Sequence, residues 1–297
     1  MKIGITGATG FVGTHLLAVA RNAGHDVIGF SRNPKPRAGF VEMRPWQPVM
    51  QADFSGLDAI VHLAGESIQG LWTGKKRKAI RRTRVEDTLA LMAGLRKLEV
   101  PPKVLVSAGG TAWYGDGGEV ELPETSRPGH GFISGVAQAW EEAALSGADV
   151  TRTVSLRTGL VLGRDGGAAT VLRRIFRLGL GGRLGGGRQW MPWIHVTDLC
   201  RLYLHVIESG AVHGPVNAVA PGAVRSAEFT KAVARALHRP AFLPVPAFAL
   251  KMLPGGMGDV FLHSQRVVPA IALDSGFSFL YPDLTAAVCD VFGHAES

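Results

Sequence analysis

KIGITGATGFVGTHLLAVARNAGHDVIGFSR, residues 2–32, predicts a strand, a glycine-rich turn, a helix and a second strand in immediate succession. Residues 2–6 are a short apolar run, which is typical of a parallel strand buried on both faces. Apolar residues recur at helical spacing over residues 11–23, and Gly24 ends the predicted helix. Residues 26–31 form the second apolar run. This order of elements is the building unit of a parallel sheet.

Three glycines follow the first strand with the spacing G-x-x-G-x-x-G. The first allows a tight turn, the second lets the backbone approach a pyrophosphate, and the third, Gly13, lets the helix pack close to the strand. The phosphates then meet free N–H groups at the amino end of the helix. Because the motif lies between a strand and a helix, it predicts dinucleotide binding. The predicted contacts of this turn are Gly7, Thr9, Gly10, Phe11 and Val12.

The end of the second predicted strand favours one dinucleotide over the other. NAD sites usually place Asp or Glu there to bind the ribose 2′-hydroxyl, whereas this chain has Ser31 and Arg32. The Arg guanidinium carries permanent charge and planar donors that suit a 2′-phosphate. The next acidic residue along the chain is Glu42. We therefore expect NADP(H) as the cofactor, with the alternative that Arg32 only begins a loop.

Strands and helices continue to alternate along the chain. Residues 33–56 contain many prolines and predict a loop with room for one more strand. The alternation predicts an α/β fold built on a Rossmann-like, doubly wound parallel sheet. Ser226 is the expected N-cap of the helix that it begins. Further strands are predicted within residues 57–65, 103–108, 150–163 and 215–220, and helices over 74–98, 131–146 and 226–239.

The composition changes after residue 163. The Gly-rich loop, residues 177–193 (RLGLGGRLGGGRQWMPW), has Trp and Arg between its glycines. It is either a mobile lid over a ligand or a surface loop anchored by Trp190 and Trp193. Chain breakers from Pro244 onward predict a small, mostly helical lobe. The expected division is an NADP-binding domain over residues 1–163, with returns from 194–220, and a lid with a C-terminal lobe over 164–297.

The bulk composition excludes several classes of protein. Of 297 residues, 46% are hydrophobic and 19% are charged, as in globular domains and unlike disordered chains. No apolar run approaches the roughly 20 residues of a membrane helix, so we expect no membrane contact. Cys200 and Cys289 have no metal-ligand spacing, so no metal site is predicted, and a cytoplasmic location is the expectation.

Basic residues gather in one segment of a chain whose formal net charge is +8. Residues 75–84, KKRKAIRRTR, hold seven of them. The segment is a solvated helix face, a set of phosphate or cofactor contacts, or a nucleic-acid surface. No zinc-finger spacing or RNA-recognition signature supports the last interpretation, so no nucleic-acid partner is expected.

Several motifs together resemble those of the extended short-chain dehydrogenases/reductases. HLAG (62–65), WYG (113–115), RTGLVLG (157–163), WIHVTDL (193–199) and GPVNA (214–218) follow the glycine turn in the order seen in that family. The segments GESI (65–68), RLGLGGRLGGGRQWMPWIHVTDL (177–199), LPVPAFAL (243–250), SQRVVP (264–269) and GFSFLYPDL (276–284) resemble its atypical, epimerase-like group, which has a small C-terminal domain of unknown function. Members are often labelled NAD-dependent epimerase/dehydratase, and some carry a cell-division-inhibitor name.

The resemblance implies further cofactor contacts. Leu63, Ala64 and Gly65 are expected beneath the adenosine half, and Thr158, Gly159 and Leu160 beside the nicotinamide. Arg84 stands where relatives commonly have Asn and is expected to reach a cofactor phosphate. The resemblance also implies that His195 and Asp198 tie the Gly-rich loop to the sheet, with the alternative that His195 serves in acid–base catalysis.

The same resemblance shows which catalytic residues differ. Relatives that transfer hydride use a Tyr-x-x-x-Lys pair to move the proton and a Ser to polarise the substrate. Aligning the helix over residues 131–146 places Ile133 and Ala137 at the Tyr and Lys positions, and a shift by one places Phe132 and Val136 there. Gly110 occupies the Ser position. The standard Ser, Tyr and Lys set is therefore predicted to be missing.

Three other residues are candidates for catalysis. Tyr114 follows the fifth predicted strand and either donates a proton or packs under its loop. Thr111 can donate a hydrogen bond, while Ser107 at the strand end is expected to be structural. Glu66 directly follows the cofactor strand and can bind substrate or ribose.

Two functions follow from these observations. The first is an NADP(H)-dependent oxidoreductase or epimerase with a non-standard proton relay and an unidentified small-molecule substrate. The alternative is a non-catalytic NADPH-binding protein that regulates a protein partner. The sequence leaves the oligomeric state open.

Overall fold

The computed structural model describes residues 1–46 and 52–293, and its centre is a parallel sheet of seven strands. The strand order is β11-β7-β5-β4-β1-β2-β3, so the chain winds outward from β1 in both directions. The predicted doubly wound α/β fold is confirmed, and β3 is the additional strand allowed within residues 33–56, of which 47–51 lie outside the described residues. The strands are β1 (Lys2–Thr6), β2 (Asp26–Ser31), β3 (Glu42–Pro45), β4 (Ala59–His62), β5 (Val104–Gly110), β7 (Arg152–Thr158) and β11 (Gly214–Ala218).

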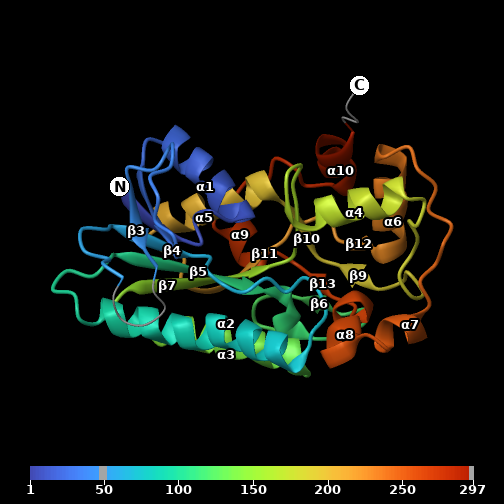
Figure 1. The fold of residues 1–297 in the computed structure, drawn as a ribbon, viewed down its shortest axis with the longest axis horizontal. Coiled ribbons are helices and arrows are strands. Elements are labelled where there is room, and N and C mark those ends of the chain that lie inside the picture. Colours follow the sequence, from blue (N-terminus) through green and yellow to red (C-terminus); the bar gives the residue numbers. More distant parts are fainter. Residues whose placement is uncertain (47–51, 294–297) are drawn as a thin grey trace.

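Helices cover both faces of this sheet (Figure 1). α1 (Phe11–Asn22) and α5 (Val196–Glu208) pack together on one face, and α2 (Gly74–Leu95) packs with α3 (Phe132–Leu145) on the other. Ile3, Ile5 and Val106 are fully buried between the layers, as the apolar runs of a doubly covered sheet require. α5 was not predicted, although it supplies much of the main core.

The remaining helices gather at one end of the molecule, shown at the right of Figure 1. They are α4 (Gly167–Arg177), α6 (Ser226–Ala236), α7 (Ala247–Lys251), α8 (Met257–Leu262) and α10 (Leu284–Phe292), while α9 (Ala270–Asp274) packs on β11. Short strands and turns join them to the sheet: η1 (Thr111–Tyr114), β6 (Glu121–Leu122), β8 (Leu160–Leu162), β9 (Trp190–Met191), β10 (Trp193–His195), β12 (Val224–Arg225), η2 (Pro254–Gly256) and β13 (Arg266–Val267). In the described part of the chain, no helix has the length and apolarity to cross a bilayer.

The Gly-rich loop is tied down along its length. The backbone N–H of Leu243 donates to the carbonyl of Gly181 at 3.3 Å, and Val245 donates to Arg183 at 2.9 Å. The indole of Trp193 is 1% exposed and donates to the carbonyl of Gly222 at 3.0 Å. These contacts favour the anchored surface loop over the mobile lid.

Two local predictions were wrong. Arg225, not Ser226, is the N-cap of α6, because the Arg225 N–H donates to the Glu228 carboxylate at 3.0 Å and Ser226 is already helical. His195 and Asp198 do not hold the Gly-rich loop. The Asp198 carboxylate accepts the backbone N–H groups of residues 280 and 281, and the His195 imidazole lies 3.3 Å from the Asp290 carboxylate of α10.

A buried polar network fixes η1 against the sheet. The Arg157 guanidinium of β7 forms a two-pronged ion pair with the Glu141 carboxylate of α3, at 2.7 and 2.9 Å. It also donates to the phenol oxygen of Tyr114 at 2.8 Å, and that hydroxyl donates to the Asn217 amide oxygen at 2.7 Å. Burial raises the pKa of Tyr114 to about 12, because its ionised form would be poorly solvated.

A buried histidine joins β1, β4 and α2. Nδ1 of His62 lies 2.8 Å from the Thr6 hydroxyl, and Nε2 lies 3.1 Å from the Thr88 hydroxyl. The Thr6 oxygen also accepts the backbone N–H groups of Leu63 and Ala64, so its own proton points to Nδ1. This pattern fits a neutral imidazole that carries its proton on Nε2. Burial lowers the pKa of His62 to about 4.

We expect Tyr114→Phe to lower the free energy of unfolding by about 1–3 kcal/mol, because buried groups of Arg157 and Asn217 lose a partner. Denaturant unfolding measures the change. Tyr203→Phe is the matched control, since Tyr203 is equally buried and the described residues supply no hydrogen bond to its hydroxyl. Equal losses in the two variants would contradict the network.

We expect the stability of the protein to fall by roughly 3 kcal/mol through His62 as the pH drops from about 6.5 to about 4. In this window the unfolded imidazole binds a proton that the folded one refuses, so stability rises with pH and the His62 contribution is complete above it. Denaturant unfolding across this pH range, compared with His62→Gln, isolates this contribution. Identical slopes for the two proteins would show that His62 is not held neutral.

Candidate functional site

The glycine turn forms a cradle at the amino end of α1. Gly7 has φ +67°, and a Cβ on it would lie 3.0 Å from the backbone nitrogen of Ala64. A Cβ on Gly13 would lie 2.6 Å from the Gly7 carbonyl oxygen, so neither position tolerates a side chain. Within the described residues, no side chain caps the first N–H groups of α1. Backbone donors without a cap, at the positive end of a helix, fit a pyrophosphate.

The loop after β4 is held against this cradle. Leu63 and Ala64 donate their backbone N–H groups to the Thr6 hydroxyl at 3.1 Å each. The Glu66 N–H donates to the Thr83 hydroxyl of α2 at 2.9 Å. Because β1 and β4 are parallel neighbours at the point where the strand order reverses, this edge is where open α/β sheets bind ligands. The predicted contacts Leu63, Ala64 and Gly65 therefore lie beside Gly7.

Three cations stabilise the charge of the Glu66 carboxylate, one by direct contact and two from farther away. Lys76 of α2 forms an ion pair with it at 2.5 Å, and the nearby charges of Arg32 and Arg84 add to its stabilisation. The Lys76 hydrogen bond is the largest cause of the lowered pKa of Glu66. Arg32 is exposed directly after β2. The predicted 2′-phosphate residue is therefore close to the loop that follows β4, with a positive balance of charge between them.

Arg84 lies beneath this loop. Its guanidinium donates to the carbonyl of Glu66 at 2.8 Å and lies 5.0 Å from the Trp140 ring. Burial lowers the pKa of Arg84 to about 10, and no carboxylate lies within 4 Å of it among the described residues. A half-buried cation of this kind holds the loop from below and adds positive potential at the cradle.

The basic side chains of residues 75–84 fall into two groups, one that contacts the protein and one that faces solvent. Lys76 and Arg84 turn to Glu66 in the loop after β4, and the cofactor-contact interpretation of these two residues stays a prediction. Arg77 packs over the Phe132 ring at 4.1 Å. The others are exposed on the outer face of α2, as the solvated-face interpretation expected; they are Lys75, Lys78, Arg81 and Arg82.

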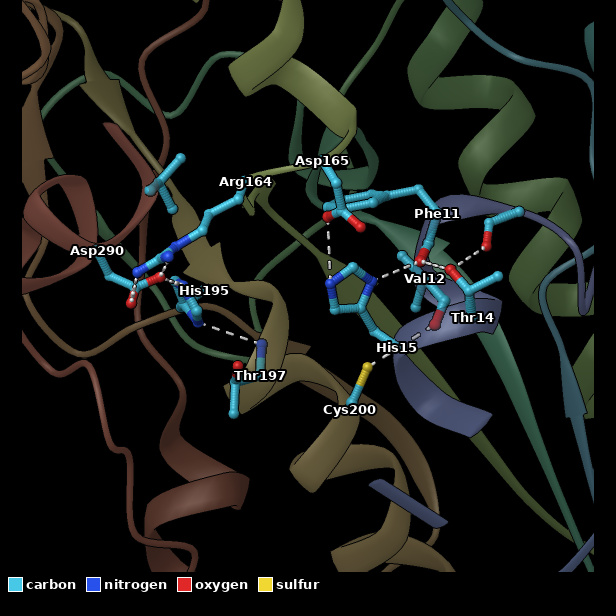
Figure 2. Close-up of polar contacts among 12 residues, drawn as sticks. Phe11, Val12, Thr14, His15, Arg164, Asp165, His195, Thr197, Cys200 and Asp290 are labelled. Carbon is cyan, nitrogen blue, oxygen red and sulfur yellow. Dashed lines mark hydrogen bonds and ion pairs between the residues drawn. The ribbon is translucent and has the colours of Figure 1, made fainter. Parts of the chain in front are cut away.

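The segment after β8 covers the cradle from the other side. A Cβ on Gly163 would lie 2.7 Å from the Phe11 ring, and Gly166 and Gly167 also pack against this ring. Figure 2 shows His15 of α1 between Phe11 and Asp165, with its Nε2 3.3 Å from the Asp165 carboxylate. Arg164 turns away to the Asp290 carboxylate of α10 at 2.9 Å (Figure 2). The amino end of α1 is therefore flanked by residues 63–66 and 163–167, while Thr9 and Gly10 are exposed.

The predicted nicotinamide-side residues lie at the carboxyl end of β7. Thr158, Gly159 and Leu160 are partly exposed, and Leu160 begins β8. Gly159 packs so closely on Pro192 that a Cβ would lie 2.8 Å from its carbonyl oxygen. The Gly-rich loop thereby meets this edge of the sheet.

The positions expected for Tyr and Lys hold packed apolar side chains. Ile133 and Phe132 contact a cluster that includes Trp72 and Met257, and Ala137 is buried. Gly110 ends β5 and precedes η1. Among the residues that the structure describes, α3 therefore has no proton donor at these positions.

The three catalytic candidates differ in their surroundings. Tyr114 is 3% exposed and engaged on both sides, which favours the packing role. Glu66 is held as a carboxylate by Lys76. Thr111 begins η1 at the carboxyl edge of the sheet and is 6% exposed, and Ser107 of β5 is fully buried. Among residues 1–46 and 52–293, no three His, Cys, Asp or Glu side chains gather as metal ligands do.

Sequence reasoning missed several residues that shape the site. Lys76 was counted only as part of a basic run, and its pairing with Glu66 depends on the path of residues 66–73. His62 was quoted within HLAG without a role, although a histidine at the end of a buried strand is itself a signal. The contact of Phe11 with the three glycines joins segments about 150 positions apart, which no local pattern reveals.

Comparison with known proteins extends these observations. The sequence profile of the NAD dependent epimerase/dehydratase family matches residues 3–219, and that of a domain of unknown function, DUF1731, matches residues 245–291. The chain is 36% identical to the human epimerase family protein SDR39U1, over 98% of this chain and 99% of that protein. It is 35% identical to the epimerase family protein YfhF of Bacillus subtilis over the whole of both chains.

Solved structures agree with the sequence comparison. A crystal structure of human SDR39U1 with NADPH superimposes with a TM-score of 0.91 at 36% identity, covering 98% of this chain and 99% of that one. The nucleoside-diphosphate sugar epimerase of Corynebacterium glutamicum gives a TM-score of 0.79 at 31% identity, covering 99% of this chain and 58% of that one. With both profiles matched in order and relatives similar over nearly their whole length, the chain belongs to the NAD-dependent epimerase/dehydratase family, with a C-terminal DUF1731 domain.

Proposed function

We propose that this protein binds NADP(H) and uses it to carry hydride in the oxidation, reduction or epimerisation of a small molecule. The observation that carries the proposal is the positive site between β2 and β4, where Arg32 is exposed and the Glu66 carboxylate is already paired with Lys76. A paired carboxylate repels a 2′-phosphate less than a free one. The NADPH in the crystal structure of the human relative supports the same choice.

Each part of the site has a separate task in this proposal. The N–H groups at the amino end of α1 bind the pyrophosphate, and Arg32 binds the 2′-phosphate. The loop of Leu63 to Gly65 supports the adenosine half, while Thr158, Gly159 and Leu160 position the nicotinamide. When bound, the cofactor supplies or accepts the hydride.

The proton needs a different route from the Tyr–Lys pair. Tyr114, with its pKa raised to about 12 and its oxygen engaged, is a poor donor at neutral pH. Glu66 is ionised for the same pH range, because Lys76 lowers its pKa. Thr111 remains, and in this proposal its hydroxyl polarises the substrate oxygen, while solvent supplies the proton that a reduction consumes and takes up the proton that an oxidation releases.

We expect Arg32→Ala to raise the Kd for NADPH about tenfold to hundredfold, because one charge-assisted contact to the 2′-phosphate is lost. The Kd for NADH should change less than about threefold, since NADH has no such phosphate. Fluorescence titration measures both constants. Arg37→Ala, an exposed arginine in the same loop, is the matched control. Equal losses for the two cofactors would overturn the 2′-phosphate assignment.

We expect deuterium transfer from 4-deuterated NADPH to at least one member of a panel of aldehydes, ketones and quinones. Thr111→Val should lower kcat about tenfold to hundredfold, with the Kd for NADPH unchanged, because a donor to the developing oxyanion is lost. Tyr114→Phe should keep its kcat. Tight NADPH binding without transfer to any acceptor would instead favour a non-catalytic protein that binds NADPH and regulates a partner. The apolar Ile133 at the expected Tyr position also agrees with that alternative.

A further inference from the structure

The end of the molecule that carries α4, α6 and α7 has an uneven distribution of charge. Residues 166–197 contain five arginines, residues 229–258 contain two lysines and two arginines, and neither segment contains Asp or Glu. Arg173 turns inward and donates to the Val291 carbonyl at 2.9 Å. The other eight cations are exposed and form no salt bridge with the part of the chain that the structure describes.

Large apolar side chains protrude from the same two segments. Leu178 and Leu180, in the Gly-rich loop, are 65% and 56% exposed. Phe242, Phe248 and Met252 are 70%, 69% and 80% exposed. Scattered single exposures need no explanation, but a cluster of this size at one end of a molecule indicates a surface that another body covers.

The two segments form one continuous surface. Residues 181–185 and 243–245 run side by side in parallel, with Gly185 donating to the Val245 carbonyl at 2.9 Å and Val245 donating to Arg183 at 2.9 Å. In Figure 1 the backbone of these two segments forms the right-hand edge, between α4 and α7. It includes an open hollow of about 650 Å³ at the carboxyl end of α6, lined by Lys231, Arg235, His238 and Arg239.

We propose that this end of the molecule docks on the surface of an anionic lipid bilayer. Protruding Phe, Leu and Met side chains enter the boundary between headgroups and acyl chains, where isolated apolar side chains gain most from burial. The surrounding Lys and Arg side chains bind lipid phosphates, and the hollow beside Arg235 and Arg239 accommodates a headgroup. This docking is independent of the proposed redox function.

Charge excludes a second copy of the chain as the natural occupant. A symmetric dimer through this surface would place eight cations against eight cations with no acidic residue in either segment to balance them. A nucleic acid would satisfy the cations but would leave the aliphatic side chains of Leu178, Leu180 and Met252 without an apolar environment. An acidic protein with an apolar groove is the remaining competitor, and the experiment below distinguishes it.

This proposal replaces the expectation that the chain makes no membrane contact. That expectation rested on the lack of a long apolar run. The exposed residues here are separated in the sequence by up to about 70 positions, and the fold brings them to one surface.

The test is co-sedimentation of the full chain with neutral phosphatidylcholine vesicles and with vesicles that contain about 30% phosphatidylglycerol. We expect the partition constant to be at least about tenfold higher on the anionic vesicles and to fall as salt rises. Arg235→Gln with Arg239→Gln should reduce it roughly thirtyfold, at about fivefold per cation. Phe242→Ser with Phe248→Ser should reduce it at least about tenfold.

Matched controls lie at the other end of the sheet. Lys97→Gln with Lys103→Gln removes two exposed cations there, and Val100→Ser replaces a side chain that is 80% exposed. Both should leave the partition constant unchanged. All variants change exposed side chains, so unchanged thermal unfolding verifies that they fold.

Three results would overturn the proposal. The first is no binding to anionic vesicles. The second is binding that the Phe242 and Phe248 substitutions leave intact, which indicates a purely electrostatic surface for an acidic macromolecule. The third is tighter binding to a duplex oligonucleotide or to polyglutamate than to the anionic vesicles.

Discussion

The close approach of the α1 backbone to the turn before it is the constraint on which the site depends. A Cβ at position 13 would lie 2.6 Å from the Gly7 carbonyl oxygen, and a Cβ at position 7 would lie 3.0 Å from the backbone nitrogen of Ala64. These two approaches fix the helix to β1 and the loop after β4 to the turn. The Thr6 hydroxyl then binds Leu63 and Ala64, and His62 carries the same connection through to Thr88 on α2. The cradle is thus built almost entirely from backbone, and its shape depends on the lack of a Cβ at Gly7 and Gly13.

Electrostatics underlies the proposed preference of this site for NADP(H) over NAD(H). The region between β2 and β4 contains a carboxylate, but Lys76 engages it and Arg84 supports its loop from below. The balance that a phosphate meets is therefore positive although Glu66 is present. On α3, by contrast, packed apolar side chains occupy the positions expected for the acid–base residues. Ile133 and Met257 of the C-terminal segment pack against the same apolar cluster. In the proposed function, the backbone of the glycine turn binds the cofactor, whereas α3 supplies no proton donor at these positions.

Local patterns were sufficient where a short segment determines its own structure. The first 32 residues predicted β1, α1 and β2, because alternating apolar runs, a glycine turn and a helix stop are all local signals. The same reasoning did not predict α4 and α5, which lie after residue 163, where the sequence becomes rich in glycine. It also could not find pairs such as Arg157 with Glu141, or Phe11 with Gly163, since the distance along the chain hides them. The start of α6 was predicted to within one residue. The expected N-cap was Ser226, and the observed N-cap is Arg225.

The helix α10 is connected to the glycine turn through the segment that follows β8. Asp290 binds both Arg164 and His195, and Arg164 adjoins the segment that packs on Phe11. During synthesis the glycine turn leaves the ribosome before Asp290, which follows more than 270 positions later. The contacts that hold the segment packed on Phe11 are therefore completed only after Asp290 has been synthesised. A nascent chain has the glycine turn long before it has these contacts.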